Sequence, residues 1–333
     1  MKVVPYTSER FPQLRETVHQ MNRGLAMSHR PFVDWYYKDN PWSRLYLAID
    51  NDKILGTLGV ESIPFQVGER IEKVGFGSNF HVLNDGIGGL LFIRWIRANP
   101  NAMVIGGSDD TQRILKGQHW SNPTDLKILT YNAPASSASN QPKALQALKH
   151  AIRKWQRKPP LQQRINRLSA VFPPEVAIES ITDFTLGNVN FRSAWQVRLA
   201  ADPAYLNWRY PRDGAVSYQR FAILSQGASQ GYVILIDGPE NIVVSLIDAT
   251  SPEMAHTGTL LALAQVQGDR KKPILLSFSD PILIERFCRS GFRLSSFNSP
   301  VWFQHPLEFP ETSLAINYGL GDNDLRLENF SPE

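Results

Sequence analysis

The chain has 333 residues, of which 42% are apolar and 20% charged, which indicates a soluble globular protein of up to two ordinary domains rather than a disordered one. Its formal net charge of +4 suits anionic small molecules as well as nucleic acid. No apolar run reaches the roughly 20 residues of a membrane span, and the N-terminus does not resemble a signal peptide. The single cysteine, Cys288, excludes an internal disulfide, and we expect a cytoplasmic protein.

The first 134 residues alternate between strand and helix patterns. Apolar alternation around Asn51-Asp52 predicts a hairpin, and a glycine-rich turn precedes an amphipathic helix. In chain order, the expected elements are a strand at 3–6, a helix at 10–21, a helical piece around Trp35, strands at 46–50, 53–62 and 71–83, a helix at 88–98, a strand at 102–107, a helix ending near Gly117 and a strand at 126–131.

The second half repeats this order. The phrase "FVDWYY", which begins at Phe32, returns as "YLNWRY" at Tyr205, and the offset stays near 172 to 175 residues over four elements. Such a constant offset indicates a duplication. The expected elements are segments at 179–186 and 203–210, strands at 218–225, 231–237 and 241–249 with a hairpin turn at Gly227-Ala228, a helix at 254–267, a strand at 273–279, a helix at 281–290 and a strand at 301–304.

The repeat predicts two domains, at 1–134 and 176–333, joined by a basic helical linker at 135–175. Alanine, serine and proline mark its start, and "KALQALKHAIRKW" has helical spacing with cations on its surface. Two interpretations of this linker stay open. It is either a solvated connector or a basic lip that attracts an anionic substrate or membrane headgroups.

The element order and the repeated phrase resemble the GNAT N-acyltransferase fold in duplicate, and in particular the bacterial tandem-GNAT proteins found with surface-polysaccharide biosynthesis. "LNWRY" fits that family's phrase better than "VDWYY", which has Tyr36 at the basic position. The resemblance implies an α/β (α+β) protein, a duplicated GNAT fold of mixed, mostly antiparallel sheets flanked by helices. We expect Trp35 and Trp208 each to pack a helix against its own sheet.

GNAT enzymes hold the pyrophosphate of coenzyme A on a glycine-rich loop at a helix start, where backbone N–H groups and the helix dipole favour an anion. The resemblance implies acetyl-CoA as acyl donor and places this loop in the first half. The expected cofactor-binding residues are Leu83, Asn84, Asp85, Gly86, Ile87, Gly88 and Gly89. Leu83 stands where the motif has Gln or Arg, and Asp85 adds a negative charge. The second half has only Gly258 at this place, so we expect Gly258→Asp to have little effect on donor binding.

Catalysis in this family is aminolysis or alcoholysis of a thioester. A tyrosine in the last helix often protonates the sulfur, and its position falls on Leu115 in the first half and Phe287 in the second. The candidates for a base are His81, which titrates in the useful range, and Glu61 at a strand end. No histidine and cysteine stand at zinc-ligand spacing, so we expect no metal site. The acidic turn at Asp322 and Asp324 carries no assigned role.

The expected function is acetyl transfer from acetyl-CoA to an amine of a small-molecule acceptor. An amino sugar or anionic sugar nucleotide in polysaccharide biosynthesis is the acceptor that the resemblance implies, and no specific nucleic acid contact is expected. Two alternatives stay open. One is a Fem-like transferase that uses aminoacyl-tRNA, which the basic linker suits. The other is a non-catalytic binding protein that has kept the tandem fold. The sequence does not indicate an oligomeric state.

Overall fold

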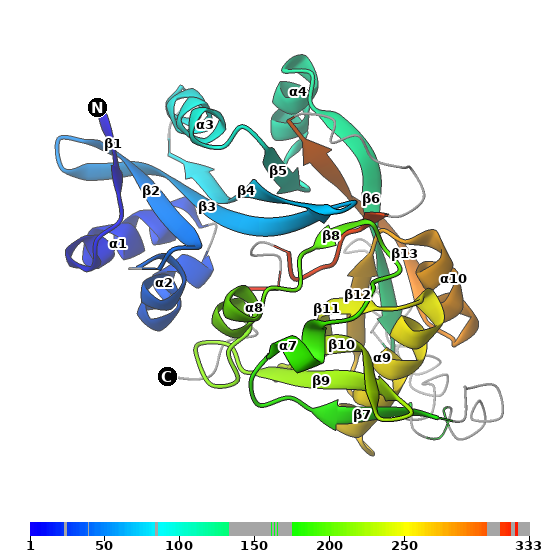
Figure 1. Ribbon diagram of the computed structural model, residues 1–333. Coiled ribbons are helices and arrows are strands. Elements are labelled where there is room, and N and C mark those ends of the chain that lie inside the picture. Colours follow the sequence, from blue (N-terminus) through cyan, green and yellow to red (C-terminus); the bar gives the residue numbers. More distant parts are fainter. Residues whose placement is uncertain are drawn as a thin grey trace, which may run out of the picture.

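A single sheet runs through both halves of the computed structural model, which describes residues 1–22, 25–38, 40–83, 86–132, 161, 163, 165, 175–304, 314–320 and 324–325. Within these residues the sheet has 14 strands, most of them antiparallel to their neighbours (Figure 1). This confirms the mixed, mostly antiparallel architecture. The domain boundaries and most of the linker, including its basic helix, lie outside the described residues and stay a prediction.

The first half contains the expected elements in the expected order. They are β1 (Lys2–Pro5), α1 (Phe11–Met21), α2 (Arg30–Tyr37), β2 (Ser43–Asp50), β3 (Lys53–Val67), β4 (Arg70–Val82), α3 (Ile87–Ala98), β5 (Ala102–Ile105), α4 (Asp109–Gly117) and β6 (Ser121–Tyr131), with short 3-10 turns at Ser8–Arg10 and Leu25–Ser28.

The second half follows the same order with two short additional strands. Its elements are β7 (Val176–Ser180), α7 (Leu186–Val189), β8 (Val197–Leu199), α8 (Pro203–Arg209), β9 (Tyr218–Ser225), β10 (Ala228–Asp237), β11 (Ile242–Ala249), α9 (Pro252–Gln267), β12 (Ile274–Phe278), α10 (Pro281–Arg289), β13 (Arg293–Phe303) and β14 (Leu314–Ala315). The predicted strand at 218–225 has the observed bounds of β9. The predicted hairpin turn is displaced by one residue, because Gln226 and Gly227 have the positive φ angles that a two-residue turn needs and Ala228 already pairs with Ser225.

The two halves exchange their last strands. The sheet order is β1-β2-β3-β4-β5-β13-β6-β12-β11-β10-β9-β7, so β13 lies between two first-half strands and β6 lies beside β12. Thus Val301 of β13 pairs with Ile105 of β5, and Leu129 of β6 pairs with Leu276 of β12. Because backbone ladders cross the boundary in both directions, neither half completes its sheet alone.

The hydrophobic cores are shared in the same way. Trp302 of β13 is 4% exposed in a cluster otherwise built from the first half, while Leu129 and Tyr131 of β6 belong to the cluster around α9 and α10. A third cluster joins the facing sides of both halves. Figure 1 shows α1 and α2 on one face of the first-half strands and α3 on the other. None of the described helices is both long and apolar enough to cross a membrane.

Because the halves exchange strands, we expect a substitution in the buried part of β13 to destabilise the first half as well. Trp302→Ala empties a large aromatic site and should lower the free energy of unfolding by roughly 3 to 5 kcal/mol. Urea unfolding, followed by circular dichroism and tryptophan fluorescence, should show both signals shifting together. Phe297→Ala is the control on the same strand, because Phe297 is 67% exposed and its loss should change little. Separate transitions, with only one shifted by Trp302→Ala, would contradict the shared core.

Candidate functional site

The first half has a groove between β4 and β5. These parallel strands pair only at Gly75–Ala102 and Phe76–Met103, although β4 continues to Val82. Just beyond the last pair, the ladder between β3 and β4 shifts register, and Asn79 adopts a φ of 44°. A bulge of this kind turns the strand away from its neighbour. The two strands therefore separate on the way to the start of α3.

Helix α3 begins beyond the point where β4 and β5 separate. Its N-cap is Gly86, with a φ of 89°, which has no side chain to accept a hydrogen bond from the first turn. A Cβ atom at Gly86 or Gly89 would meet nothing within 4 Å, and one at Gly88 would meet the Phe80 ring at 3.4 Å and Val82 at 3.9 Å. The backbone N–H groups of a helix start favour an anion, and the glycines leave space beside them.

The structure places only part of the predicted phosphate loop. Leu83 is half-buried and donates its backbone N–H to Leu55 O at 2.8 Å, while Ile87 is buried as the first residue of α3. Asn84 and Asp85 lie outside the described residues. His81, one of the predicted bases, is a partly exposed residue of β4 that pairs with Thr57, two residues beyond the bulge at Asn79. His81 thus belongs to β4, which borders the groove, and its role as a base stays a prediction.

Glu61, the other predicted base, is fully buried. Its two carboxylate oxygens accept hydrogen bonds from the hydroxyls of Tyr36 and Tyr205, each at 2.5 Å. Burial raises the pKa of Glu61, with Arg209 acting in the opposite direction. Burial also raises the pKa values of Tyr36 and Tyr205 well above 10. The role of Glu61 as a base stays untested, and this enclosed geometry favours a structural role.

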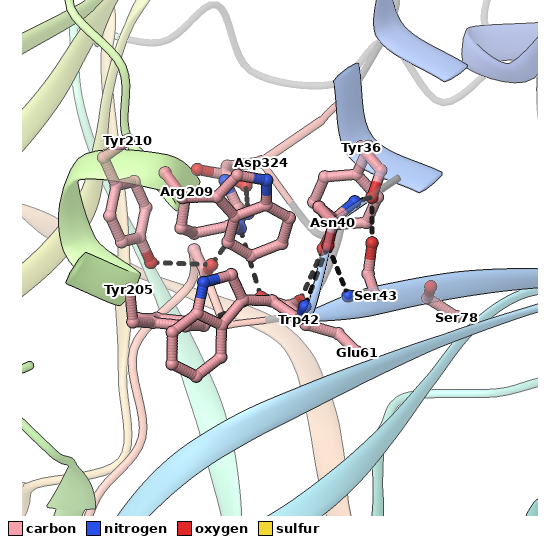
Figure 2. A network of polar contacts seen from close by, with 12 residues as sticks. Tyr36, Asn40, Trp42, Ser43, Glu61, Ser78, Tyr205, Arg209, Tyr210 and Asp324 are labelled. Atoms are coloured by element: carbon pink, nitrogen blue, oxygen red, sulfur yellow. Dashed lines mark hydrogen bonds and ion pairs between the residues drawn. The ribbon is translucent and has the colours of Figure 1, made fainter. Parts of the chain in front are cut away.

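Arg209 is the centre of a polar cluster between the halves (Figure 2). It lies 3.6 Å from Glu61 of the first half and 2.6 Å from Asp324 near the C-terminus, and all three side chains have no exposed area. Its guanidinium also donates to Tyr218 and to Gly319 O, at 2.9 and 3.0 Å. Burial acts to lower the pKa of Arg209, but Asp324 and the tyrosines outweigh this effect and raise the pKa. The cluster therefore holds Glu61 of the first half, Arg209 of the second half and Asp324 together.

The repeated phrases meet each other in this interface. The indole Nε1 of Trp35 donates to the backbone oxygen of Trp208 at 3.2 Å, and the Trp208 ring stacks on Tyr36 with centroids 5.5 Å apart. Each tryptophan therefore also makes contacts across the halves, which the prediction that it packs a helix against its own sheet did not include. Tyr36 and Arg209 hold equivalent places in the two phrases, and the guanidinium of Arg209 lies 5.5 Å from the centre of the Tyr36 ring. Tyr36, which stands in the first phrase where the family has a basic residue, is thus a partner of Arg209, the basic residue of the second phrase.

The second half has the same groove, but its own chain fills it. Strands β11 and β12 pair from Ile242–Ile274 to Val244–Leu276 and then separate. The side-chain amide of Asn317 bonds both the N–H and the C=O of Ile247 in β11, at 3.0 and 3.2 Å, and its backbone bridges Phe278 of β12. Residues 314–320 are all buried. This segment therefore occupies the place where β11 and β12 separate.

The helix start in the second half is also closed. Ser251 caps α9 by accepting from the N–H of Met254 at 3.1 Å, and Pro252 is the first helical residue. A Cβ at Gly258 would lie 2.5 Å from Ile223 of β9, so this glycine allows close packing of helix on strand. Gly258→Asp would therefore disturb this packing, and its effect on donor binding stays a prediction. The start of α9, with its serine cap, differs from that of α3, whose N-cap is a glycine.

A pocket of about 630 Å³ lies at the end of the sheet formed by β1 and β2. It is lined by the ends of β1 and α2 and the start of β2, and Tyr37 forms part of its wall. Lys38 and Arg44 bring two cations to it, and Glu9 brings one carboxylate. Among the residues that the structure describes, no three histidine, cysteine, aspartate or glutamate side chains gather as metal ligands would.

No protein-family model matches the chain, and no curated protein matches it by sequence. Solved structures do match. A tandem GNAT protein from the clavulanic acid biosynthesis pathway has a TM-score of 0.55 at 11% identity and covers 96% of this chain and 99% of its own. A GCN5-related N-acetyltransferase from Anabaena variabilis has a TM-score of 0.53 at 12% identity over 91% and 72%. The N-myristoyltransferase of Saccharomyces cerevisiae, solved with myristoyl-CoA, has 0.57 at 7% over 91% and 82%.

These comparisons establish the fold and nothing finer. At identities of 7 to 12%, the chain shares the duplicated GNAT fold with these proteins. Sequence reasoning missed several residues that the structure brings to the site, namely Tyr37, Ser78 and Asn79 at the first groove and Arg209 and Asp324 at the interface. The repeated phrase was the available signal, since its last tyrosine and its arginine both belong to this set.

Because the ion pair of Arg209 and Asp324 is buried, losing its carboxylate should cost more stability than losing a surface carboxylate. Asp324→Ala removes the nearer of the two described carboxylates from the buried Arg209, and the free energy of unfolding should fall by roughly 3 to 5 kcal/mol. Asp110→Ala is the matched control, because Asp110 pairs with Arg113 on the surface at 80% side-chain exposure. Thermal and urea unfolding should separate the two variants clearly. Equal stability of the two would contradict the role of Arg209 in holding this cluster together.

His256 in α9 predicts a pH dependence. Burial lowers the pKa of His256 to about 4, and Arg286 adds to the shift. Because the folded pKa is below the ordinary value of 6.5, the stabilisation is present above pH 6.5 and is lost as the pH falls through 4. The loss should be roughly 3 kcal/mol. His256→Gln, which cannot titrate but can still bond Ser290, should show a shallower loss of stability over this range. The same slope in both proteins would contradict the assignment.

Proposed function

We propose that the chain is an acyl-CoA-dependent N-acyltransferase whose first half binds the donor, with acetyl-CoA as the simplest one. The observation that carries this proposal is the uncapped glycine start of α3 at the end of the groove between β4 and β5. The helix start offers N–H groups to a pyrophosphate, and the diverging strands offer an extended slot to the pantetheine arm. The fold shared with acetyltransferases supports the same assignment.

The asymmetry of the halves supports one donor site per chain. In the second half, Ser251 caps the start of α9, and the buried segment 314–320 lies between β11 and β12. Neither the helix start nor the gap between the strands is then available to a donor. Of the two predicted bases, we retain His81, which is partly exposed in β4, and regard Glu61 as part of the interface. The linker on which an aminoacyl-tRNA alternative would rest lies outside the described residues.

The pocket beside Tyr37 supports a small acceptor with a negative charge. Lys38 and Arg44 are exposed cations in its lining, and they would hold a carboxylate or phosphate while the acceptor's amine reaches the thioester. An amine of a sugar, including an anionic sugar nucleotide of polysaccharide biosynthesis, has these properties. We propose this acceptor class and a cytoplasmic location, where acyl-CoA is supplied.

Gly89 gives a direct test of the donor site. Gly89→Asp places a carboxylate in the first turn of α3, where nothing lies within 4 Å of the new Cβ. It should stabilise the helix but repel the pyrophosphate and weaken acetyl-CoA binding by roughly tenfold or more. Gly89→Asn has the same size without the charge and should bind nearly as wild type does. Calorimetry measures binding, and circular dichroism with thermal unfolding checks the fold.

The outcomes of this titration separate the proposals. Weaker binding by Gly89→Asp alone supports a phosphate at α3. Equal binding by wild type and both variants would place the donor elsewhere in the chain. An absence of binding by the wild type at millimolar acetyl-CoA would reject the transferase proposal in favour of a non-catalytic binding protein.

A further inference from the structure

The hydroxyl of Tyr37 reaches β4 where that strand leaves β5. Tyr37 is the last residue of α2, and its hydroxyl lies 3.4 Å from the Ser78 hydroxyl, two residues beyond the final pair of β4 with β5. Gly59 of β3 makes this approach possible, because a Cβ at residue 59 would lie 2.3 Å from the Tyr37 oxygen. The Tyr37 hydroxyl therefore lies over β3 and β4, at a glycine that a larger residue could not replace.

Asn79 orients the hydroxyl. The side-chain Nδ2 of Asn79 donates to the Tyr37 oxygen at 2.9 Å. A phenolic oxygen has one proton and accepts with its lone pairs, so a hydroxyl that accepts from Asn79 directs its own proton elsewhere. Asn79 is the residue of the bulge with a φ of 44°, a conformation that tends to be kept at functional sites.

The second half shows what the equivalent tyrosine does in an occupied groove. Tyr210 ends the second copy of the repeated phrase as Tyr37 ends the first. Its hydroxyl donates to the carbonyl oxygen of Gly319 at 3.0 Å, and the Gly319 N–H donates to Ser245 O of β11 at 2.7 Å. The segment that fills the second groove thus presents a carbonyl oxygen to the tyrosine that closes the phrase.

The first half places its tyrosine at the acyl end of the slot. From Val82, near the start of α3, back to Ser78 is about 13 Å at roughly 3.3 Å per strand residue. This length is comparable to an extended pantetheine arm. A donor whose pyrophosphate lies at α3 therefore brings its thioester close to Ser78 and the Tyr37 hydroxyl. Tyr37 also contributes to the lining of the proposed acceptor pocket.

We propose that the Tyr37 hydroxyl donates a hydrogen bond to the acyl carbonyl oxygen of the bound thioester, with Asn79 as its positioning residue. This inference rests on the proposed function. The acceptor's amine forms a C–N bond to the carbonyl carbon, and the C=O electron pair moves to the oxygen, where Tyr37 stabilises the charge. The pair then returns as the C–S bond breaks with its electrons on sulfur. The nitrogen gives a proton to His81, the base of the proposed function, and the thiolate takes one from water.

The carbonyl stretch of bound acetyl-CoA tests this bond without an acceptor. Full-length protein is loaded with acetyl-CoA carrying ¹³C at the carbonyl, and isotope-edited infrared difference spectra give the band of the bound ligand. A hydrogen bond to the oxygen shifts that band to lower frequency. The wild type and Tyr210→Phe, which loses the same hydroxyl from the second phrase, should show the shift, and Tyr37→Phe should not.

Ligand comparison gives an independent measurement. The thioether S-ethyl-CoA keeps the length of acetyl-CoA but has no carbonyl oxygen. Wild type should bind acetyl-CoA roughly three- to tenfold more tightly than S-ethyl-CoA, the usual effect of one hydrogen bond, and Tyr37→Phe should lose this preference while retaining S-ethyl-CoA affinity. Should Tyr37→Phe fold poorly, an unshifted wild-type band or equal wild-type affinities for the two ligands would still reject the inference.

Two results would overturn the inference. A shifted band that persists in Tyr37→Phe, or equal wild-type affinity for the two ligands, shows that Tyr37 does not bind the carbonyl while leaving the proposed function intact. An absence of acetyl-CoA binding by wild type rejects the proposed function and this inference together.

Discussion

The exchange of β6 and β13 is the constraint on which the rest of the structure depends. Each half needs a strand of the other to complete its sheet, so the halves cannot rotate freely about a linker. This fixed arrangement brings α2 and α8 together and buries Arg209 between Glu61 and Asp324. A buried guanidinium with two carboxylates is stable only when all three are in place. The ion cluster therefore follows from the strand exchange and in turn holds the C-terminal segment against the second half.

One duplicated fold has reached two different states in the same chain. The first half has strands β4 and β5 that diverge, a glycine N-cap at α3 and a tyrosine at the bulge of β4. The second half has a serine cap, a glycine used for close packing and a segment wedged between β11 and β12. Asn317 is central to the difference, because its amide satisfies backbone groups of β11 that would otherwise need another partner. The second half, whose groove is filled by residues 314–320, holds the first half in position through the shared sheet.

The sequence predicted the local elements well because alternation, caps and turn residues act over short distances. β9 has the predicted bounds, whereas the segment predicted around 179–186 ends as a strand at Ser180 and resumes as the short helix α7. The exchange of β6 and β13 was beyond sequence reasoning, because both are apolar strands after equivalent helices and either could pair with β5 or β12. For the same reason, the meeting of Trp35 with Trp208 and the partner of Asp324 could not be predicted, since contacts between duplicated halves leave no periodic signal.

Hydrogen exchange with and without acetyl-CoA tests the central claim, that the first half alone binds the donor while the second groove stays filled by its own chain. The account predicts that the ligand slows amide exchange in β4 and the first turn of α3, at residues 78–90. It predicts no change in β11 and the start of α9, at 245–258, and continued protection of residues 314–320. Ligand-dependent protection at 245–258, or faster exchange at 314–320 on binding, would contradict it by showing that the second groove opens to take the donor.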